Sequence, residues 1–457
     1  MGIHRGTKDP RQRPGEGLLQ RELRNRLYYG WVVVAVVFLA LLVSAGVRAA
    51  PAVLINPLET EFGWGRAAIS FAASVGLLLY GLSGPVAGWL MDRFGPRRIT
   101  LLGIALIGGS TLAGTAMTEL WQLNLFWGVL SGVGTGVVAP VLGATVANRW
   151  FVERRGLVLG IFGAAASAGQ LVSVPALMWL VVSVGWREGT VYLAAVAFLV
   201  LAPVLLLMRD DPSRLSLRPY GLPEEGIAAE ESPAPEPGTA AKAPVETSPE
   251  PREGGALSRA FKTPEFWLLS GSFFICGASS NGIIGVHFVP HSIDHGIPEV
   301  TAASALALMG AMNFVGTIAS GWLTDRYDPR KLLAIYYSLR GLSLLLLPFV
   351  TDFSGLAVFA VFFGLDYIAT VPPTVALVAD RFGRLNVGAV FGWVFFSHQV
   401  GAALASYLGG VARDSLGDYT LAFLAAGVLA ILASLMAYLI NRGPLSPAPA
   451  GATGSRL

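Results

Sequence analysis

Five ionisable side chains lie inside long apolar stretches of this 457-residue chain: Arg48, His287, Arg340, Asp366 and His398. A charged group at the centre of a bilayer costs about 2.5–3.5 kcal/mol even on insertion-based scales, so each is a candidate for function. A guanidinium can hold a carboxylate through two parallel hydrogen bonds. A carboxyl group or an imidazole can carry a proton. The pattern therefore indicates the binding of an anion and the movement of a proton.

Arg48 is the candidate for binding the anion. It lies deep in the apolar run 28–55, and Ser44 precedes it by one helical turn. We predict that both side chains contribute to a substrate site. The alternative is that the long Arg48 side chain extends along the helix to the outer membrane surface.

Asp366 is a candidate for carrying the proton. It lies midway along the run 354–379, where desolvation would favour the neutral acid. Arg340 lies midway along the run 332–351, and our main interpretation makes it a structural partner of Asp366 or of backbone carbonyls. For Asp366, structural pairing and proton coupling both remain open.

Two histidines extend this set. His287 lies toward the outer end of the run 264–290, and His398 lies midway along the run 387–412. A lone histidine among helices is more often a hydrogen-bonding structural residue, yet a nearby carboxylate and arginine make both candidates for proton coupling. His287 is also a candidate for substrate binding. No three potential ligands share helical spacing, so we predict no metal site and no cofactor.

A stripe of polar side chains follows the run 301–324 at steps of four, three and four residues: Asn313, Thr317, Ser320 and Thr324. Such a stripe either lines a transport pathway or forms hydrogen bonds between helices. We include Asn313 among the candidates for substrate binding.

The elements that would position these residues are membrane-spanning helices. The chain is 54% hydrophobic and 13% charged, whereas an ordinary soluble domain is roughly 25% charged. Twelve apolar runs are long enough to cross a bilayer: 28–55, 67–90, 99–117, 121–147, 156–184, 189–208, 264–290, 301–324, 332–351, 354–379, 387–412 and 419–440. The single cysteine, Cys276, excludes an internal disulfide and a cysteine-based metal site. We predict an all-α membrane protein.

The chain contains an internal duplication. The segment 88–98 (GWLMDRFGPRR) recurs as 321–331 (GWLTDRYDPRK), and the segment 147–160 resembles 379–392 at nearly the same offset. Two matches at one offset predict two like halves of six helices each. This organisation is typical of secondary transporters, which bind their substrate between the halves.

The domain boundaries and the topology follow from composition. We predict a cytoplasmic segment, a six-helix half, a disordered linker rich in Pro, Ala and Glu, a second half and a cytoplasmic tail, at 1–27, 28–208, 209–262, 263–441 and 442–457. With a cytoplasmic N-terminus, three of the 32 Lys and Arg residues lie outside and two lie within helices, which leaves 27 inside. We therefore expect a plasma-membrane protein with both termini in the cytoplasm.

The paired loops resemble the Gly-x-x-x-Asp-Arg-x-Gly-x-Arg-Arg motif of the major facilitator superfamily, and the resemblance covers nearly the whole chain. Tyr29-Gly30-Trp31 and the segment from Trp150 to Gly160 are similar to bacterial relatives of monocarboxylate porters and oxalate–formate exchangers. The resemblance implies the twelve-helix fold in two pseudo-symmetric halves. It also implies that helices one, four, seven and ten line a central cavity, which places Arg48 in the cavity, and that helix nine with Arg340 is peripheral.

The sequence departs from the family pattern at three places. Gly128 lies near the position of the family's usual arginine in the fourth helix. Animal-type monocarboxylate carriers have an Asp-x-x-x-Arg pair in helix eight, where this chain has Asn313 and Thr317. Ala52 follows Pro51 where those carriers have a lysine. These absences put lactate-type specificity in doubt, although Arg48 could supply the missing positive charge.

The charged residues of the repeated loops are candidates for a gate. A carboxylate at a helix end with arginines nearby can form charge-assisted hydrogen bonds to neighbouring helix ends. If these contacts exist only when the cytoplasmic side is closed, they favour one of two states. The alternative is that the charges only set topology, which we favour for Arg98 and Lys331. The gate candidates are Asp92, Arg93, Arg97, Asp325, Arg326 and Arg330.

The leading functional hypothesis is a secondary active transporter of a small organic anion, specifically a monocarboxylate moved with a proton. It would act as a monomer in the bilayer, without nucleic acid, and it would not be an enzyme. One alternative is a proton-driven efflux antiporter for apolar or cationic compounds, in which Asp366 would meet the substrate. A second, less favoured alternative is a membrane sensor that does not transport.

Overall fold

The computed structural model describes residues 28–222, 256–383 and 386–441, and these residues are nearly all helical. The β-pairing within them is an isolated bridge between Phe151 and Tyr220. The N-terminal half contains α2 (Gly30–Ala49), α3 (Pro51–Phe62), α4 (Arg66–Phe94), α5 (Pro96–Gly114), α6 (Leu120–Leu123), the π-helix η1 (Asn124–Leu130), α7 (Ser131–Val137), α8 (Pro140–Trp150), α9 (Arg155–Val184) and α10 (Trp186–Leu207). Two short helices, η2 (Pro212–Leu215) and α11 (Ala256–Ala260), follow it.

The C-terminal half repeats this order. It contains α12 (Pro264–Gly277), the π-helix η4 (Ala278–Ile284), α13 (Gly285–Asp294), α14 (Glu299–Thr324), α15 (Pro329–Leu346), the 3-10 helix η5 (Leu347–Phe349), α16 (Phe353–Asp366), α17 (Val371–Phe382), α18 (Val387–Leu416) and α19 (Thr420–Tyr438). Each predicted apolar run corresponds to one straight or interrupted helical unit. By length and apolarity, ten of these units in the described residues can cross a membrane, and α5 and α18 lie in the bundle beside them.

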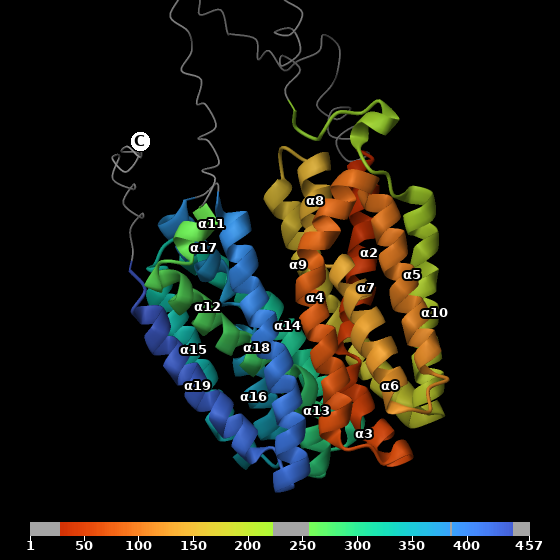
Figure 1. The fold of residues 1–457 in the computed structure, drawn as a ribbon, viewed down its shortest axis with the longest axis vertical. Helices are drawn as coiled ribbons and strands as arrows, with labels where there is room; N and C mark the ends of the chain where they lie inside the picture. Colours follow the sequence, from red (N-terminus) through yellow and green to blue (C-terminus); the bar gives the residue numbers. More distant parts are fainter. Residues whose placement is uncertain (1–27, 223–255, 384–385, 442–457) are drawn as a thin grey trace, which may run out of the picture.

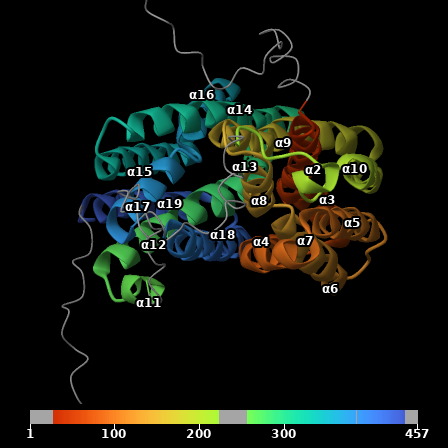
Figure 2. The same cartoon turned by 90° about the horizontal axis from the view of Figure 1, so that it is seen from above.

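The two halves stand side by side (Figures 1 and 2). They meet along two seams, where α4 packs on α18 and α9 packs on α14. We call the end of the bundle that carries Trp150 and Leu207 the linker end, and the opposite end, which carries Phe62 and Arg66, the far end. The linker end is at the top of Figure 1.

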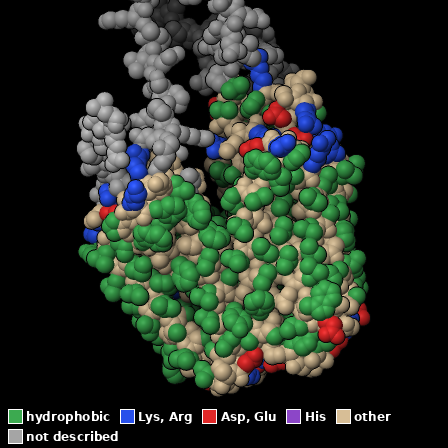
Figure 3. Space-filling view, in the orientation of Figure 1, with side chains coloured by type: hydrophobic (Ala, Val, Ile, Leu, Met, Phe, Trp, Pro, Cys, Tyr) green, Lys and Arg blue, Asp and Glu red, His purple; other side chains and the backbone are tan. Residues whose placement is uncertain are grey.

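The halves are joined at the middle and the far end and are separated at the linker end. The hydrogen bonds and ion pairs that connect the two halves within the described ranges involve α4, α9 and the elements they face, between the Ser167–Asn313 contact and the far end. Figure 3 shows a notch between the halves at the linker end. The structure is therefore open toward the linker end.

Four of the helical units are interrupted near mid-depth. The interruptions are the α2–α3 junction before Pro51, residues 138–139 before Pro140, the π-helix η4, and residues 367–370 before Pro372 and Pro373. These four units bury 50 to 83% of their most apolar windows inside the protein. Irregular backbone in a membrane protein is tolerated where it is covered by protein or lines a cavity, so the interruptions mark the interior of the molecule as the place for a site.

We predict a disordered linker at 209–262. The structure describes residues 209–222 and 256–262 at the two ends of this range, and both ends contain a short helix. Tyr220 is 8% exposed, its backbone N–H donates to the Trp150 carbonyl at 2.8 Å, and its carbonyl accepts from Val152 N at 2.9 Å. The Tyr28 hydroxyl donates to the carbonyls of Trp150 and Arg218. Burial raises the pKa of Tyr28 to about 12, so this hydroxyl remains a donor at neutral pH.

Aromatic packing explains why this part of the linker is ordered. Composition alone made residues 209–222 look like the Pro- and Glu-rich stretch that follows, but Tyr220 packs on the rings of Tyr28 and Phe151. At the other end, α11 precedes α12, whose N-cap Thr263 accepts from Phe266 N. Residues 1–27, 223–255 and 442–457, for which we predict cytoplasmic or linker segments, lie outside the described residues.

Asp210, in the same ordered segment, supports the repeated loop of the N-terminal half. It is 5% exposed, and its Oδ1 accepts from the backbone N–H of Arg97 at 2.8 Å, at the start of α5. In the C-terminal half the equivalent N–H, that of Arg330, is capped by Asp328 at 3.0 Å. The position equivalent to Asp328 is Gly95, which has φ = +89° and leaves room for the Asp210 carboxylate. The two halves thus cap the same helix start with carboxylates from different places.

We predict that Tyr220→Ala releases residues 209–222 from the linker end, because it removes the ring that packs on Tyr28 and Phe151. Trypsin should then cleave after Arg214 about tenfold faster than in the native chain, since local opening controls cleavage. Mass spectrometry of timed digests measures this. Leu217→Ala, at an exposed side chain, is the matched control, and equal cleavage rates in the native chain and Tyr220→Ala would contradict the role of the ring.

Candidate functional site

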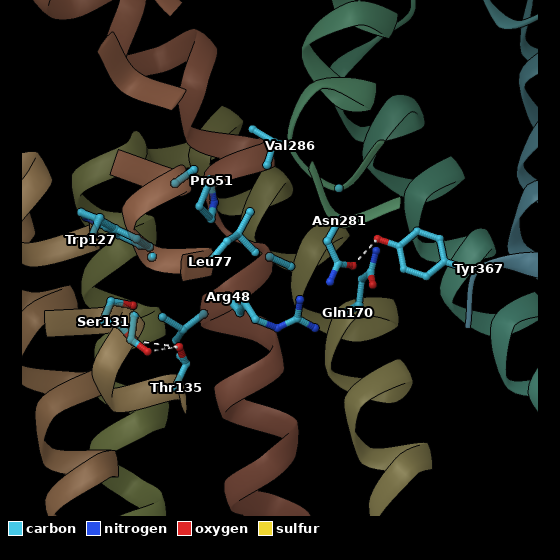
Figure 4. Close-up of a pocket in the computed structure, with 16 residues that line it drawn as sticks. Arg48, Pro51, Leu77, Trp127, Ser131, Thr135, Gln170, Asn281, Val286 and Tyr367 are labelled. Atoms are coloured by element: carbon cyan, nitrogen blue, oxygen red, sulfur yellow. Dashed lines mark hydrogen bonds between the residues drawn. The ribbon is translucent and has the colours of Figure 1, made fainter. Parts of the chain in front are cut away.

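A cavity lies between the two halves at the level of the helix interruptions (Figure 4). Its apolar wall includes Leu77, Trp127 and Val286. Its polar lining consists of Arg48, Ser131, Thr135, Gln170, Asn281 and Tyr367. None of the lining residues is acidic, so the described cavity carries the single positive charge of Arg48.

Arg48 occupies the last turn of α2, just before the break at Pro51. Its guanidinium carbon lies 5.4 Å from the centroid of the Tyr80 ring. Among the described residues, no carboxylate forms an ion pair with it and no acceptor forms a hydrogen bond with it. A cation over an aromatic face gains roughly 0.5–2 kcal/mol, which leaves the five N–H donors of the guanidinium available to a ligand.

Three uncharged polar side chains, those of Gln170, Asn281 and Tyr367, face Arg48 across the cavity. The Tyr367 hydroxyl donates to Asn281 Oδ1 at 3.2 Å, so the Asn281 amide N–H groups remain available. Figure 4 shows the Arg48 side chain extending toward Asn281, Gln170 and Tyr367. Arg48 and Gln170 belong to the N-terminal half, whereas Asn281 and Tyr367 belong to the C-terminal half. A molecule held here would contact both halves.

Backbone irregularity positions two of these side chains. Asn281 lies in the π-helix η4, and Tyr367 begins the turn between α16 and α17. π-Helical segments occur frequently at functional sites. Pro372 and Pro373 cannot donate the hydrogen bonds that would continue the helix, and the freed carbonyl of Ala369 accepts from the Ser320 hydroxyl at 2.5 Å.

Arg340 and Asp366 form a buried ion pair away from the cavity lining. Arg340 Nε lies 2.7 Å from Asp366 Oδ2, and the two side chains are 0% and 6% exposed. The second guanidinium nitrogen donates to the carbonyls of Asp366 and Tyr367 at 2.7 and 3.2 Å. The third contacts the Cys276 sulfur at 2.8 Å. Arg340 therefore neutralises Asp366 and also satisfies the carbonyls at the end of α16.

One oxygen of Asp366 lacks a partner. Oδ1 is buried and accepts no hydrogen bond from any described residue. A buried carboxylate oxygen without a hydrogen-bond partner is unfavourable, and it is the oxygen on which a proton could reside without breaking the contact of Oδ2 with Arg340. Tyr367, the next residue, lines the cavity, so this oxygen lies one residue from the candidate anion site.

Ser44 and Asn313, both predicted for substrate binding, do not line the cavity. The Ser44 hydroxyl donates to the Thr135 carbonyl at 3.4 Å, where α2 packs on α7. Asn313 Nδ2 donates to Ser167 Oγ at 3.1 Å across the two halves, and its Oδ1 accepts from Ile368 N at 3.1 Å. Asn313 thus stabilises the α16–α17 turn from α14, as the hydrogen-bonding alternative for the polar stripe expected.

The two predicted histidines also lie off the cavity. His287 Nε2 is 2.7 Å from the Ser406 carbonyl, and the ring packs on Tyr419 near the far end. His398 is 8% exposed and lies between the rings of Phe273 and Phe395. No group of three His, Cys, Asp or Glu side chains in the described ranges is arranged to hold a metal ion.

The repeated loops differ in their contacts. In the N-terminal half, Arg149 forms an ion pair with Asp92 at 3.0 Å, which joins the first and second repeated segments. In the C-terminal half, the residue equivalent to Arg149 is Arg381, which pairs with Glu265 at 3.0 Å. The backbone N–H of Asp325, the equivalent of Asp92, donates to the Gly321 carbonyl at 3.3 Å, but its carboxylate forms no hydrogen bond or ion pair with any residue that the structure describes.

The remaining gate candidates are arginines that contact aromatic rings or backbone carbonyls of their own halves. The Arg93 guanidinium stacks on Trp89, and Arg97 donates to the Leu205 carbonyl at the end of α10. Arg326 stacks on Trp322 at 4.0 Å, and Arg330 donates to the Ile440 carbonyl at 3.1 Å. Among the described residues, no hydrogen bond, ion pair or ring contact joins these side chains to the other half.

Gln170, Asn281, Tyr367 and Tyr80 are among the site residues that the sequence did not identify, together with Ser131 and Thr135. Uncharged polar residues are common in membrane helices, so none of them stood out. The adjacent prolines Pro372 and Pro373 were a usable signal, because they predict a break in the helix beside Tyr367.

A family model described as Major Facilitator Superfamily matches residues 36–323 and 280–456. The chain is 27% identical to rat monocarboxylate transporter 13 over 89% of its length and 87% of the relative. It is 28% identical to the uncharacterized MFS-type transporter YcxA of Bacillus subtilis (strain 168), over 80% of this chain and 84% of the relative.

Solved structures resemble the fold at low sequence identity. A bacterial homologue of the human lysosomal transporter Spinster, in an inward-facing and unoccupied conformation, matches with a TM-score of 0.68 at 16% identity. That match covers 90% of this chain and 97% of the homologue. A D-xylose–proton symporter matches with a TM-score of 0.68 at 15% identity, over 90% of this chain and 98% of the symporter.

We predict that Arg340→Met lowers the free energy of unfolding by about 3–5 kcal/mol, because it leaves the Asp366 carboxylate buried and unpaired. The double variant Arg340→Met/Asp366→Leu should recover much of this loss, since no uncompensated charge remains. Thermal unfolding in detergent, followed by tryptophan fluorescence, measures both. A double variant no more stable than Arg340→Met would contradict charge pairing as the cause.

Proposed function

Because the chain belongs to the Major Facilitator Superfamily, it is a membrane transporter rather than an enzyme, and we propose that its substrate is a small organic anion. Specifically, we propose a monocarboxylate that moves together with a proton by alternating access. The protein would act as a monomer in the plasma membrane, with the linker end in the cytoplasm. The positive-inside distribution of Lys and Arg supports this orientation.

The observation that carries the proposal is the unpaired guanidinium of Arg48 in a cavity without acidic residues. A cation in the interior of a membrane protein needs a counter-charge, water or an aromatic face. Tyr80 supplies only the aromatic face. A carboxylate would supply the counter-charge and accept two parallel hydrogen bonds from the guanidinium.

The relatives support the choice of anion class. Rat monocarboxylate transporter 13 and human monocarboxylate transporter 11 are each 27% identical to this chain over 89% of its length. The described lining contains one guanidinium and a few amides and hydroxyls. A single cationic group favours a substrate with a single carboxylate. A second carboxylate would find no second cationic side chain among the described lining residues.

For the proton we propose Asp366, with His398 and His287 as the other candidates. Asp366 is buried, and its Oδ1 has no partner among the described residues. It also adjoins Tyr367 in the cavity wall. His287 and His398 are packed among aromatic rings away from the lining, which favours a structural role for them.

For the gate at the linker end we propose the repeated loops, with Asp92 and Asp325 at its centre. In the open arrangement Asp92 is held by Arg149 and the Asp325 carboxylate is without a partner among described residues. Closing the linker end would bring the two loops together and offer Asp325 the arginines of the other half. Such a contact would exist in one state only, which is the condition for a conformational bias.

The antiporter alternative, export of apolar or cationic compounds, has less support. It requires an acidic residue at the substrate, whereas the described lining contains none and Asp366 is engaged by Arg340. No observation favours a sensor that does not transport.

We predict that Arg48→Gln reduces uptake of the carried monocarboxylate about 100-fold or more. The reason is the loss of two charge-assisted hydrogen bonds to the carboxylate. Arg48→Lys should reduce uptake less, because the positive charge remains. It should still reduce uptake, because lysine cannot form the bidentate hydrogen bonds of arginine. Uptake of a panel of labelled mono- and dicarboxylates and organic cations into proteoliposomes measures this.

The control for this experiment is Arg187→Gln, which removes an arginine that is paired with Glu61 at the far end, outside the cavity. It should transport at the native rate. Native anion uptake by Arg48→Gln, or uptake of cations alone by the native protein, would overturn the proposal.

We predict that Asp366→Asn abolishes accumulation driven by a pH gradient but retains exchange of internal for external anion. The amide cannot carry the proton, whereas exchange needs no net proton movement. His398→Gln and His287→Gln should keep their response to the gradient. Gradient-driven accumulation and counterflow in the same liposomes measure both, and a full response in Asp366→Asn would assign the proton elsewhere.

A further inference from the structure

Arg66, at the start of α4, connects the two halves at the far end. Its two terminal nitrogens donate to both oxygens of Asp294 on α13, at 2.6 and 2.8 Å. One of them also donates to the Tyr419 hydroxyl at 3.0 Å. Its Nε donates to Glu59 of its own half at 2.8 Å. The guanidinium thus donates four hydrogen bonds, and three of them go to the other half.

A second contact crosses the halves at the same place. Asp414 on α18 accepts from the backbone N–H groups of Arg66 and Ala67, at 2.9 and 2.8 Å. These are orphan N–H groups of the first turn of α4, which a helix normally caps with a side chain of its own segment. Here the cap comes from the opposite half. We call Arg66, Asp294, Asp414 and Tyr419 the far-end clasp.

Arg66 and Tyr419 form the buried part of the clasp, whereas Asp294 and Asp414 are exposed. Arg66 is 3% exposed and Tyr419 is 1% exposed. Gly410 allows this closeness, because a Cβ at that position would lie 2.7 Å from the Arg66 carbonyl oxygen and 2.8 Å from the Ala67 Cα.

Each charged residue of the Arg66–Asp294 pair has a second counter-ion in its own half, so the pair can separate without leaving an uncompensated charge. Asp294 is shared with Arg413, whose Nε lies 2.9 Å from Oδ2. Arg66 is shared with Glu59. Each partner of the cross-half pair thus keeps a counter-ion in its own half when the halves separate. A buried ion pair gains little net free energy over its solvated partners, so water entering between the halves can replace it.

We propose that the far-end clasp is the gate that closes the far end of the transporter, and that it must open once in every transport cycle. It holds the arrangement seen here, in which the cavity opens toward the linker end. It is built from residues other than the repeated loops, so the two ends of the molecule close by different chemistry. The proposal does not depend on which solute is carried.

Distances between spin labels test the gate without a substrate. The full chain, in a Cys276→Ser background, is labelled at the far end after Thr60→Cys and Ser415→Cys, both at exposed positions on opposite halves. A second sample is labelled at the linker end after Arg98→Cys and Lys331→Cys. Pulsed electron double resonance of the protein in lipid nanodiscs then gives the populations of the open and closed arrangements at each end.

We expect Arg66→Gln to raise the ratio of far-end-open to far-end-closed molecules about tenfold, with a matching gain of the closed arrangement at the linker end. Arg66→Lys should give a smaller shift in the same direction. Gly410→Ala should also open the far end, because the added methyl group meets the backbone of α4. It keeps every charge, so it decides the question if Arg66→Gln does not yield folded protein.

Arg187→Gln is the matched control, because it breaks an ion pair at the same end that lies within one half. Its distance distributions should equal those of the native chain. Unchanged populations in Arg66→Gln and Gly410→Ala, or a shift that Arg187→Gln reproduces, would overturn the gate. Because no anion is present, a failure of the proposed anion transport would leave this result standing, and the reverse also holds.

Discussion

Ionised side chains inside a bilayer must be compensated, and this constraint organises the molecule around three arginines. Arg340 is compensated within its own half by Asp366 and by the carbonyls at the end of α16. Arg66 is compensated by Asp294 of the other half and by Glu59 of its own half. Arg48 has an aromatic face and no acidic partner among the described residues. The Arg340–Asp366 pair stabilises the fold of one half, and the Arg66–Asp294 pair connects the two halves. The unpaired guanidinium of Arg48 marks the candidate site.

The interrupted helices follow from the same constraint. A break exposes backbone carbonyls and N–H groups that lipid cannot satisfy. Arg340, Ser320 and Asn313 satisfy those of the α16–α17 turn. The break then holds Tyr367 against Asn281, opposite Arg48. The buried pair that stabilises the break is therefore adjacent to the polar residues that face the cavity, because Asp366 pairs with Arg340 and directly precedes Tyr367 in the chain.

The sequence predicted the features that depend on composition or on repetition. The two halves follow from repeated loops, and Arg48, Arg340 and Asp366 are recognisable because a charge in an apolar run is costly. Asn281 and Tyr367 were missed because uncharged polar residues are unremarkable in a membrane helix. Arg66 was missed for another reason. It stands at the end of an apolar run, where a charge is ordinary, and its burial depends on how the halves meet.

The proposed transport depends on an anion that binds Arg48 between the two halves. Diffraction from crystals grown with a short bromine-labelled monocarboxylate tests it most directly, because the anomalous signal of bromine locates the ligand without assumptions about its pose. We expect one site, with the carboxylate within hydrogen-bond distance of the Arg48 guanidinium and the rest of the ligand toward Asn281 and Tyr367. A ligand bound elsewhere in the molecule, with the Arg48 guanidinium unoccupied, would contradict it.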